Sequence, residues 1–162
     1  MEKYIVLLAA CSFVAIVSAY SGGAPVDVCD DMLPKHPVAP QTSKLPYTLQ
    51  STKSSASPGD RVKITINGNG GKSFKGLLIQ GRQGDEIVGS FEVSDSDKYI
   101  KTINCPKGTK NAVTHKNNED KKSITVDYIV PNTKGQITFY ATVAENGGVF
   151  WVKQPTAKIN VN

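Results

Sequence analysis

The side chains best able to do chemistry in this 162-residue sequence are its three cysteines and two histidines. Cys11 lies in an apolar N-terminal segment, whereas Cys29, Cys105, His36 and His115 are spread over the rest of the chain. A zinc site needs three or four ligands, and two histidines beside two cysteines that are expected to be oxidised supply too few. We therefore expect no metal and no cofactor, and we expect each histidine to make a local hydrogen bond or to pack near a disulfide.

Carboxylates and serines offer the other routes to a chemical site. Asp27, Asp30 and Asp31 form one acidic group, and Asp95 with Asp97 forms a second. Neither group has the spacing of an EF-hand calcium loop, and acidic residues clustered in turns usually cap backbone amides. No Gly-x-Ser-x-Gly elbow occurs, and no pair of carboxylates is marked out by its surroundings for glycoside cleavage. We therefore expect a protein that is not an enzyme.

The N-terminal segment has the composition of a secretory signal peptide. Lys3 precedes an apolar run over residues 4–17, and the small side chains of Val17 and Ala19 occupy the positions that signal peptidase reads. The run is shorter than the roughly 20 residues that a membrane-spanning helix needs. The sequence therefore predicts a signal peptide over residues 1–19, cleavage between Ala19 and Tyr20, a secreted extracellular product and no membrane anchor.

Cleavage at this point would remove Cys11 and leave Cys29 and Cys105. An even number of cysteines in an oxidising compartment favours one intrachain disulfide. The bond would close a long loop, a constraint that the chain-entropy model values at roughly 4–5 kcal/mol. Two free thiols or a pair of metal ligands are the alternatives to this disulfide.

The elements that must position these residues are short β-strands. Polar and apolar residues alternate with a period of two, which is typical of a strand with one buried face, over residues 61–66, 123–130, 136–143 and 157–161. Less regular candidates lie at 47–51, 74–81, 87–93, 99–103 and 149–152. Turns rich in glycine, asparagine and proline separate these segments. The sequence predicts an all-β, immunoglobulin-like antiparallel β-sandwich of about eight or nine short strands.

Residues 20–46 differ from the rest of the chain because prolines recur along them. Proline fixes φ and lacks an amide donor, so this stretch is neither a long helix nor a central strand. We expect an extended N-terminal arm that lies over the sandwich and is tied to it by the disulfide of Cys29. The immunoglobulin hallmark of a tryptophan between two cysteines is missing, because Trp151 follows both cysteines.

Residues 104–122 form a long polar stretch that carries five lysines against Glu119 and Asp120. The formal net charge of the protein is +5, so this stretch holds much of the excess. A loop this long without an element of its own tends to be functional or disordered. Several exposed lysines acting together can bind anionic groups, and a solvated loop without a ligand is the alternative. The candidate ligand-binding residues are Lys107, Lys110, Lys116, Lys121 and Lys122.

Several blocks of the sequence resemble the reeler domain, in order along the chain. They are SGGAP at 21–25, CDDMLPKH at 29–36, SPGD at 57–60, FKGLLIQ at 74–80, AVTHKN at 112–117, FYATV at 139–143 and FWV at 150–152. Together they extend over nearly all of residues 20–162, which we identify as one reeler domain.

This resemblance implies a function that the residues alone do not show. The short form with a signal peptide is similar to the insect defence proteins of the family, which implies a non-enzymatic role in innate immunity. The implied partners are microbial surface polyanions or glycans, such as lipopolysaccharide, teichoic acid and glucan, together with haemocytes in nodulation; antimicrobial action belongs to the same role, and nucleic acid is not expected. Reeler domains also occur in matrix proteins and beside haem-containing membrane modules. An extracellular interaction module without a microbial ligand and a redox partner are therefore the alternatives.

Overall fold

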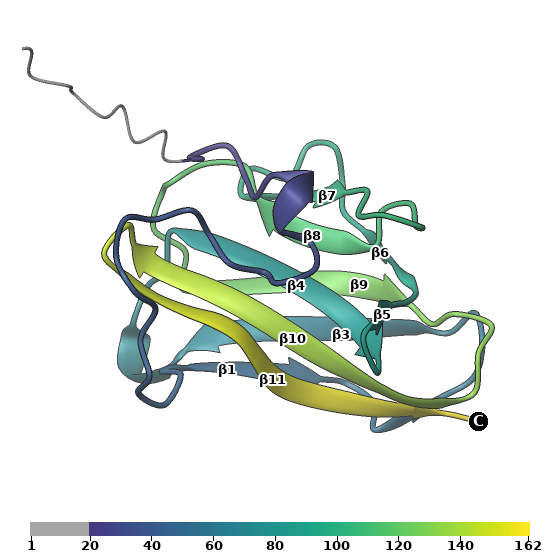
Figure 1. Ribbon diagram of the computed structural model, residues 1–162. Helices are drawn as coiled ribbons and strands as arrows, with labels where there is room; N and C mark the ends of the chain where they lie inside the picture. The colour runs from purple at the N-terminus through teal and green to yellow at the C-terminus, as the bar shows by residue number, and fades with distance from the viewer. Residues whose placement is uncertain (1–19) are drawn as a thin grey trace, which may run out of the picture.

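The computed structural model describes residues 20–162 and shows two β-sheets (Figure 1). The first sheet is built from strands in which apolar and polar residues alternate. Strand β3 buries Val62, Ile64 and Ile66 on one face, as its period-two pattern predicts. The sheet has the order β1-β3-β9-β6, and all of its pairings are antiparallel. Its strands are β1 (Tyr47–Ser51), β3 (Arg61–Gly68), β6 (Ser90–Glu92) and β9 (Ser123–Ile129).

The second sheet contains the longest strands of the protein. Its order is β2-β11-β10-β4-β8-β7, and β5 pairs with β4. The pairing of β11 with β2 is parallel, and the other pairings are antiparallel. Its strands are β2 (Ser55–Ala56), β4 (Gly76–Gln83), β5 (Glu86–Ile87), β7 (Ile100–Ile103), β8 (Ala112–His115), β10 (Gly135–Asn146) and β11 (Val149–Val161).

The two sheets pack face to face around an apolar core. The rings of Tyr128 on β9 and Phe139 on β10 meet across this core with their centroids 4.8 Å apart and their planes nearly perpendicular. Trp151 is buried as well, and its indole N–H donates to the carbonyl of Ser43 at 3.0 Å. The predicted β-sandwich is therefore confirmed. Residues 20–162 hold nine strands of three residues or more, besides the two-residue strands β2 and β5.

Strand β4 differs from the others because both of its faces are buried over almost its whole length. Leu77 and Ile79 belong to the core between the sheets, whereas Leu78 packs in a second apolar cluster with Met32. This second cluster exists because the N-terminal arm, residues 20–46, crosses the outer face of the second sheet (Figure 1). A strand that is covered on both sides carries a continuous apolar run instead of a clean alternation.

A disulfide between Cys29 and Cys105 ties the arm to the sandwich. Cys29 directly follows a one-turn 3₁₀ helix, η1 (Val26–Val28), and Cys105 follows β7. A second such turn, η2 (Asn69–Gly71), follows β3. The Cα atoms of the two cysteines are 5.8 Å apart, and the bond closes a sequence separation of 76 residues. The expected extended arm held by a disulfide is thus confirmed.

Two expectations about the strands are wrong. Residues 104–122 are not one loop, because β8 lies among them and pairs with β4 and β7 inside the sheet. Strand β8 is four residues long and is flanked by polar residues, so its alternation was too brief to indicate a strand. Residues 149–152 and 157–161 belong to the single strand β11, which continues through an irregular stretch where Lys153 has a φ of 47°.

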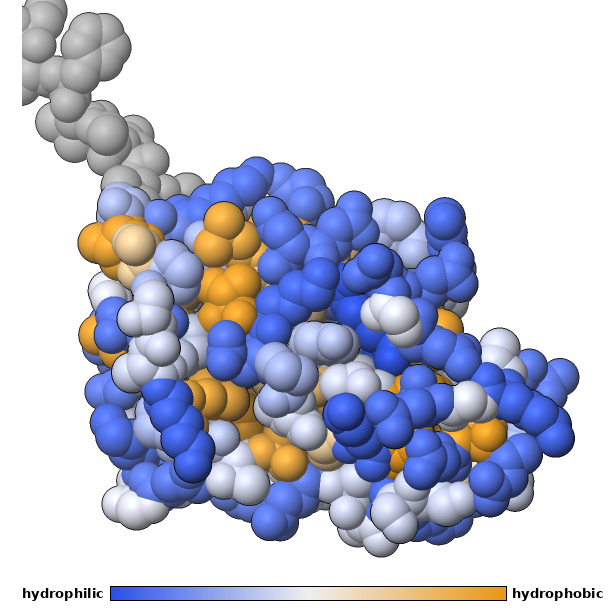
Figure 2. Space-filling view, turned by 60° about the horizontal axis from the view of Figure 1, so that its bottom comes forward, coloured by the Kyte–Doolittle hydropathy of each residue, from blue (hydrophilic) through white to orange (hydrophobic). Residues whose placement is uncertain are grey.

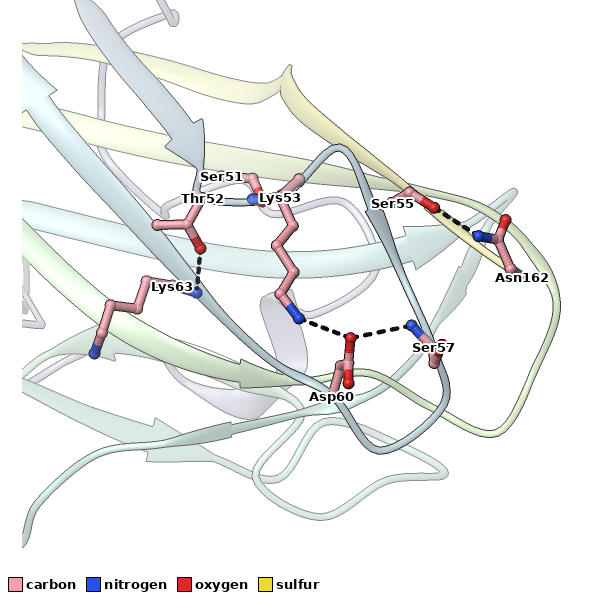
Figure 3. A network of polar contacts seen from close by, with 8 residues as sticks. All are labelled: Ser51, Thr52, Lys53, Ser55, Ser57, Asp60, Lys63 and Asn162. Carbon is pink, nitrogen blue, oxygen red and sulfur yellow. Dashed lines mark hydrogen bonds and ion pairs between the residues drawn. The ribbon is translucent and has the colours of Figure 1, made fainter.

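Polar contacts fix the short strand β2 and the turn that joins it to β3 (Figure 3). The Lys53 ammonium donates to the Asp60 carboxylate at 2.8 Å, and the Ser57 amide donates to the same oxygen at 3.2 Å. The hydrogen bond from Lys53 and, to a smaller extent, the one from Ser57 lower the pKa of the Asp60 carboxyl below its ordinary value. The side-chain amide of Asn162 donates to the Ser55 hydroxyl at 2.8 Å, which holds the end of β11 beside β2.

The predicted signal peptide over residues 1–19, with its cleavage point after Ala19, lies outside the described residues. Tyr20 is the first residue that the structure describes, and it is 47% exposed. Within residues 20–162, no helix has both the length and the apolar character that crossing a membrane demands.

Candidate functional site

Lys107 and Lys110 are exposed together in the turn that joins β7 to β8. Both have positive φ angles, 66° and 51°. The side-chain carbonyls of Asn111 and Asn104 hold this turn, because they accept the backbone amides of Cys105 and Lys110 at 2.7 Å each. Neither lysine forms an ion pair within residues 20–162. The turn therefore presents two cations to solvent beside the disulfide.

Lys121 is not available to a ligand. Its position in a polar stretch predicts an exposed ligand-binding lysine, and this expectation is wrong. The side chain is 2% exposed, and its ammonium donates to the carbonyls of Lys75, Asn117 and Glu119 at 2.9, 2.8 and 2.7 Å. Burial lowers the pKa of this ammonium, and the nearby acidic groups of Glu119 and Asp120 oppose the shift. Lys121 therefore connects the segment after β8 to the start of β4.

Lys116 and Lys122 are placed apart from the turn of Lys107 and Lys110. The Lys116 ammonium donates to the carbonyls of Asp95 and Asp97 at 3.0 and 2.7 Å, so it holds the loop before β7. Lys122 is exposed and directly precedes β9, in the other sheet. The predicted single basic loop is therefore divided by β8 into separate features.

A cavity of about 320 Å³ lies between the arm and the outer face of the second sheet. Val28 and Met32 line it from the arm, and Leu78 and Ala144 line it from strands β4 and β10. This volume is at the lower end of the range that is usual for ligand pockets, roughly 300–1,000 Å³. The cavity is therefore a candidate ligand site with an apolar interior.

The guanidinium of Arg82 anchors the arm beside this cavity. Arg82 is 3% exposed, and its Nη2 donates to the carbonyls of Cys29 and Asp30 at 2.6 and 2.9 Å. Nε and Nη2 also donate to the side-chain oxygen of Gln80 at 2.9 and 2.7 Å, and Nη1 donates to the Asp85 carbonyl at 3.1 Å. Burial lowers the pKa of this guanidinium. One buried cation on β4 thus holds the backbone of the arm around the disulfide.

Further contacts fix the arm on either side of Cys29. The Thr142 hydroxyl on β10 donates to the Met32 carbonyl at 2.7 Å, and the Ala24 amide donates to the Thr114 hydroxyl on β8 at 2.8 Å. Gly23 has a φ of 122°, and a Cβ there would lie 2.7 Å from a backbone carbonyl of β8. Only glycine allows this close approach without displacing the arm.

Both histidines line the cavity, and His115 makes hydrogen bonds through its ring, as the sequence predicts for each histidine. The Leu77 amide donates to Nδ1 of His115 at 3.2 Å, so the ring hydrogen of the neutral imidazole is on Nε2. Nε2 donates it to the Tyr20 carbonyl at 3.1 Å. Desolvation lowers the pKa of His115, so its ring is neutral at neutral pH. The ring of His36 packs against Phe150 with the centroids 4.9 Å apart.

The charged residues that line the cavity are all cationic. Lys35 and Lys75 are both exposed side chains among the lining residues, and no aspartate or glutamate is among them. Lys35 forms an exposed ion pair with Asp27, whereas Lys75 forms none within residues 20–162. The described part of the chain also holds no group of three or more His, Cys, Asp or Glu side chains that could bind a metal.

Sequence reasoning did not identify the cavity or its rim lysines. The available signal was the uninterrupted apolar run of β4, residues 77–79, which is more typical of a strand buried on both faces than of one at a surface. A second signal was Met32 beside Cys29, because an apolar residue next to a disulfide anchor indicates packing onto the sheet.

These features define a class of protein: a two-sheet β-sandwich whose disulfide-tied arm covers a cavity on one sheet. The Reeler domain family matches residues 27–162, and the chain belongs to this family. The protein of Bombyx mori named “Putative defense protein” is 39% identical over 170 residues, which cover 99% of each chain. “Defense protein l(2)34Fc” of Drosophila melanogaster is 37% identical over 97% of this chain and 98% of its own.

A solved structure shows the same fold. The crystal structure of the Reelin-N domain of F-spondin is similar with a TM-score of 0.64, over 76% of this chain and 91% of that chain. The two sequences are 17% identical, so this similarity establishes the architecture alone.

Proposed function

We propose that this chain is a secreted, non-enzymatic defence protein that binds anionic components of microbial surfaces. The observation that carries the proposal is the similarity to defence proteins of insects along almost the whole length of both chains. Lipopolysaccharide, teichoic acid and glucan are the microbial ligands to test, and haemocytes are the host partner in nodulation. Secretion through the predicted signal peptide brings the protein to these partners and supplies the oxidising environment in which the disulfide forms.

The charge of the protein supports binding to polyanions. Its formal net charge is +5, and the exposed pair of Lys107 and Lys110 stands on a turn that is held by a disulfide and two asparagines. Exposed charge contacts are individually weak and are screened by salt, so binding through this turn would require several such contacts on a repetitive surface.

The experiment is a pull-down of the secreted protein on whole bacteria, fungal glucan and haemocytes over a series of salt concentrations. The test variant is Lys107→Glu with Lys110→Glu. The matched control is Lys134→Glu with Lys158→Glu, which changes the net charge by the same amount. Lys134 directly precedes β10, Lys158 lies on β11, and both are exposed. We expect saturable binding to microbes that weakens with salt, and a loss of about fivefold in the test variant, because exposed contacts contribute roughly 0.2–1 kcal/mol each and reversal turns attraction into repulsion.

The outcomes separate the proposal from its alternative. Equal losses in the test and control variants would mean that net charge and not this turn governs binding. Retention by haemocytes or by a single host protein, with no retention by microbes, would replace the proposal with an extracellular interaction module without a microbial ligand.

A further inference from the structure

The cavity beneath the arm is separate from the lysine turn of the proposed function. None of the five lysines predicted to bind a ligand lines it, and its two lining lysines come from other segments: Lys35 from the arm and Lys75 from the residue before β4. The cavity is therefore a second feature of the molecule that needs its own explanation.

The cavity cannot close by a simple collapse of the arm onto the sheet. Protein interiors are close-packed and hold few voids larger than a water molecule, so a gap of this size is unusual. Here the arm is fixed at Ala24 by β8, at Cys29 by the disulfide and by Arg82, and at Met32 by Thr142. These anchors lie around the gap and hold it open.

The chemistry of the lining suits one class of ligand. Val28, Met32, Leu78 and Ala144 offer an apolar interior, in which an alkyl chain is favourable because its burial removes apolar surface from water. Lys35 and Lys75 are exposed, and no carboxylate is among the lining residues. Lys35 is paired with Asp27, which lies outside the lining, whereas Lys75 forms no ion pair within residues 20–162. An apolar interior beneath a cationic rim is complementary to a molecule with an alkyl chain and an anionic head.

The outer surface of the arm is also apolar in places. Tyr20, Val26, Leu33 and Val38 are the large hydrophobic residues that are exposed within residues 20–162, at 41–47%, and all four lie on the arm. Figure 2 shows apolar residues that reach the surface in separate patches between hydrophilic ones. Of these four residues, Tyr20 lines the cavity, so its exposed ring extends the apolar lining to the surface.

We propose that the cavity beneath the arm binds the alkyl chain of a single-chain anionic amphiphile, whose head group lies at Lys35 and Lys75. The volume of about 320 Å³ accommodates one medium-length chain. The binding of an amphiphile follows from the cavity. The proposed defence function supplies only the source of the amphiphile, a microbial lipid.

The test is calorimetric titration of the secreted protein with ligands of matched chain length. Decanoate, decanol and decyltrimethylammonium share the chain and differ in the charge of the head. Lysophosphatidylglycerol carries a phosphate head and separates a phospholipid source from a free fatty acid. We expect saturable binding of decanoate, weaker binding of decanol and no measurable binding of the cationic ligand.

Two variants locate the site. Ala144→Leu fills the cavity from β10, and its control Ala39→Leu makes the same change at an exposed position of the arm. We expect Ala144→Leu to weaken decanoate binding about tenfold because its added carbons displace methylenes of the ligand. Lys75→Glu, with Lys158→Glu as its control, should weaken decanoate binding about fivefold and leave decanol binding unchanged.

A nitroxide-labelled fatty acid gives a readout that does not depend on the variants folding. Amide signals of Leu78 and Ala144 should broaden on its addition, while those of β1 should not. Failure of decanoate and lysophosphatidylglycerol to bind, or broadening confined to other strands, would overturn the inference. Equal binding of all three head groups would overturn the assignment of the head to the lysines. The pull-down with Lys107→Glu and Lys110→Glu remains a separate test, since neither residue lines the cavity.

Discussion

Replacement of Arg82 by methionine should loosen the arm on the sheet, although the disulfide still ties it there. Methionine keeps much of the length and apolar stem of arginine but has no donors, so the change removes the hydrogen bonds and leaves a side chain that still fills the space. Arg61 is the other arginine of the sequence, and it is exposed on β3. Arg61→Met is therefore a control with the same chemistry at the surface.

The magnitude follows from the acceptors that Arg82 leaves behind. Within residues 20–162, the side-chain oxygen of Gln80 accepts hydrogen bonds from Arg82 alone, whereas the Cys29 carbonyl keeps a second donor, the side-chain nitrogen of Gln80 at 3.0 Å. A buried acceptor that loses its donor costs about 1–3 kcal/mol, and the other two carbonyls are less buried. Removal of a buried cation recovers part of its desolvation cost. We therefore expect Arg82→Met to lower the free energy of unfolding by about 2–3 kcal/mol.

The assay is urea unfolding followed by the fluorescence of Trp151, the single tryptophan, which is buried and hydrogen-bonded to Ser43 of the arm. Proteolysis of the native protein should also cut within the arm faster in Arg82→Met than in the parent protein. Arg61→Met should change neither measurement appreciably, because its ion pair with Glu92 is exposed. If Arg82→Met is as stable as the parent and its arm is equally resistant, the desolvation of the guanidinium cancels its hydrogen bonds and our account of the anchor is refuted.

The disulfide and the buried histidine give two further predictions. Replacement of both Cys29 and Cys105 by serine should lower the free energy of unfolding in urea by about 4–5 kcal/mol, because the closed loop spans 76 residues; a loss below about 1 kcal/mol would show that the other anchors hold the arm by themselves. The pKa of His115 is lowered from its ordinary 6.5, so the unfolded chain binds a proton more readily than the folded one; stability is full above pH 6.5 and falls as the pH drops below it. Urea titrations between about pH 5 and pH 8 should show this decline in the parent protein and a smaller one in His115→Gln, and an unchanged decline would assign it to other groups.

The sequence was sufficient for strands that have one buried face. Val62, Ile64 and Ile66 alternate with polar residues because β3 lies between a core and solvent, and this contrast is visible in a single sequence. The same contrast is absent from β4, where the arm buries the second face, and from β8, which is four residues long and flanked by polar residues. The polar composition of residues 104–122 therefore predicts a loop with five surface lysines, although the stretch contains β8 and Lys121 is buried.

The candidate site was harder to predict because its parts meet only in three dimensions. The disulfide could be predicted since cysteine chemistry leaves few alternatives, and it correctly placed the arm on the sandwich. Nothing in the spacing of Met32 and Ala144 indicates that they line one cavity, because the sheet order that brings β10 beside β4 is not encoded by local periodicity. The sequence shows that Lys75 is charged, but nothing in it indicates that this lysine lies at the rim of a cavity.

The order of synthesis has a consequence for the arm. The arm leaves the ribosome before every strand that it contacts, and the Thr142 hydroxyl that fixes Met32 follows it by 110 residues. Contacts between such distant segments form slowly, because a long loop of chain must close first. The contact at Met32 therefore forms only once β10 has joined β4, whereas the contacts of the arm with β4, with Cys105 and with β8 become available earlier. A chain that stops before β10 contains the arm but lacks Thr142, and therefore lacks the hydrogen bond that fixes Met32 on the sheet.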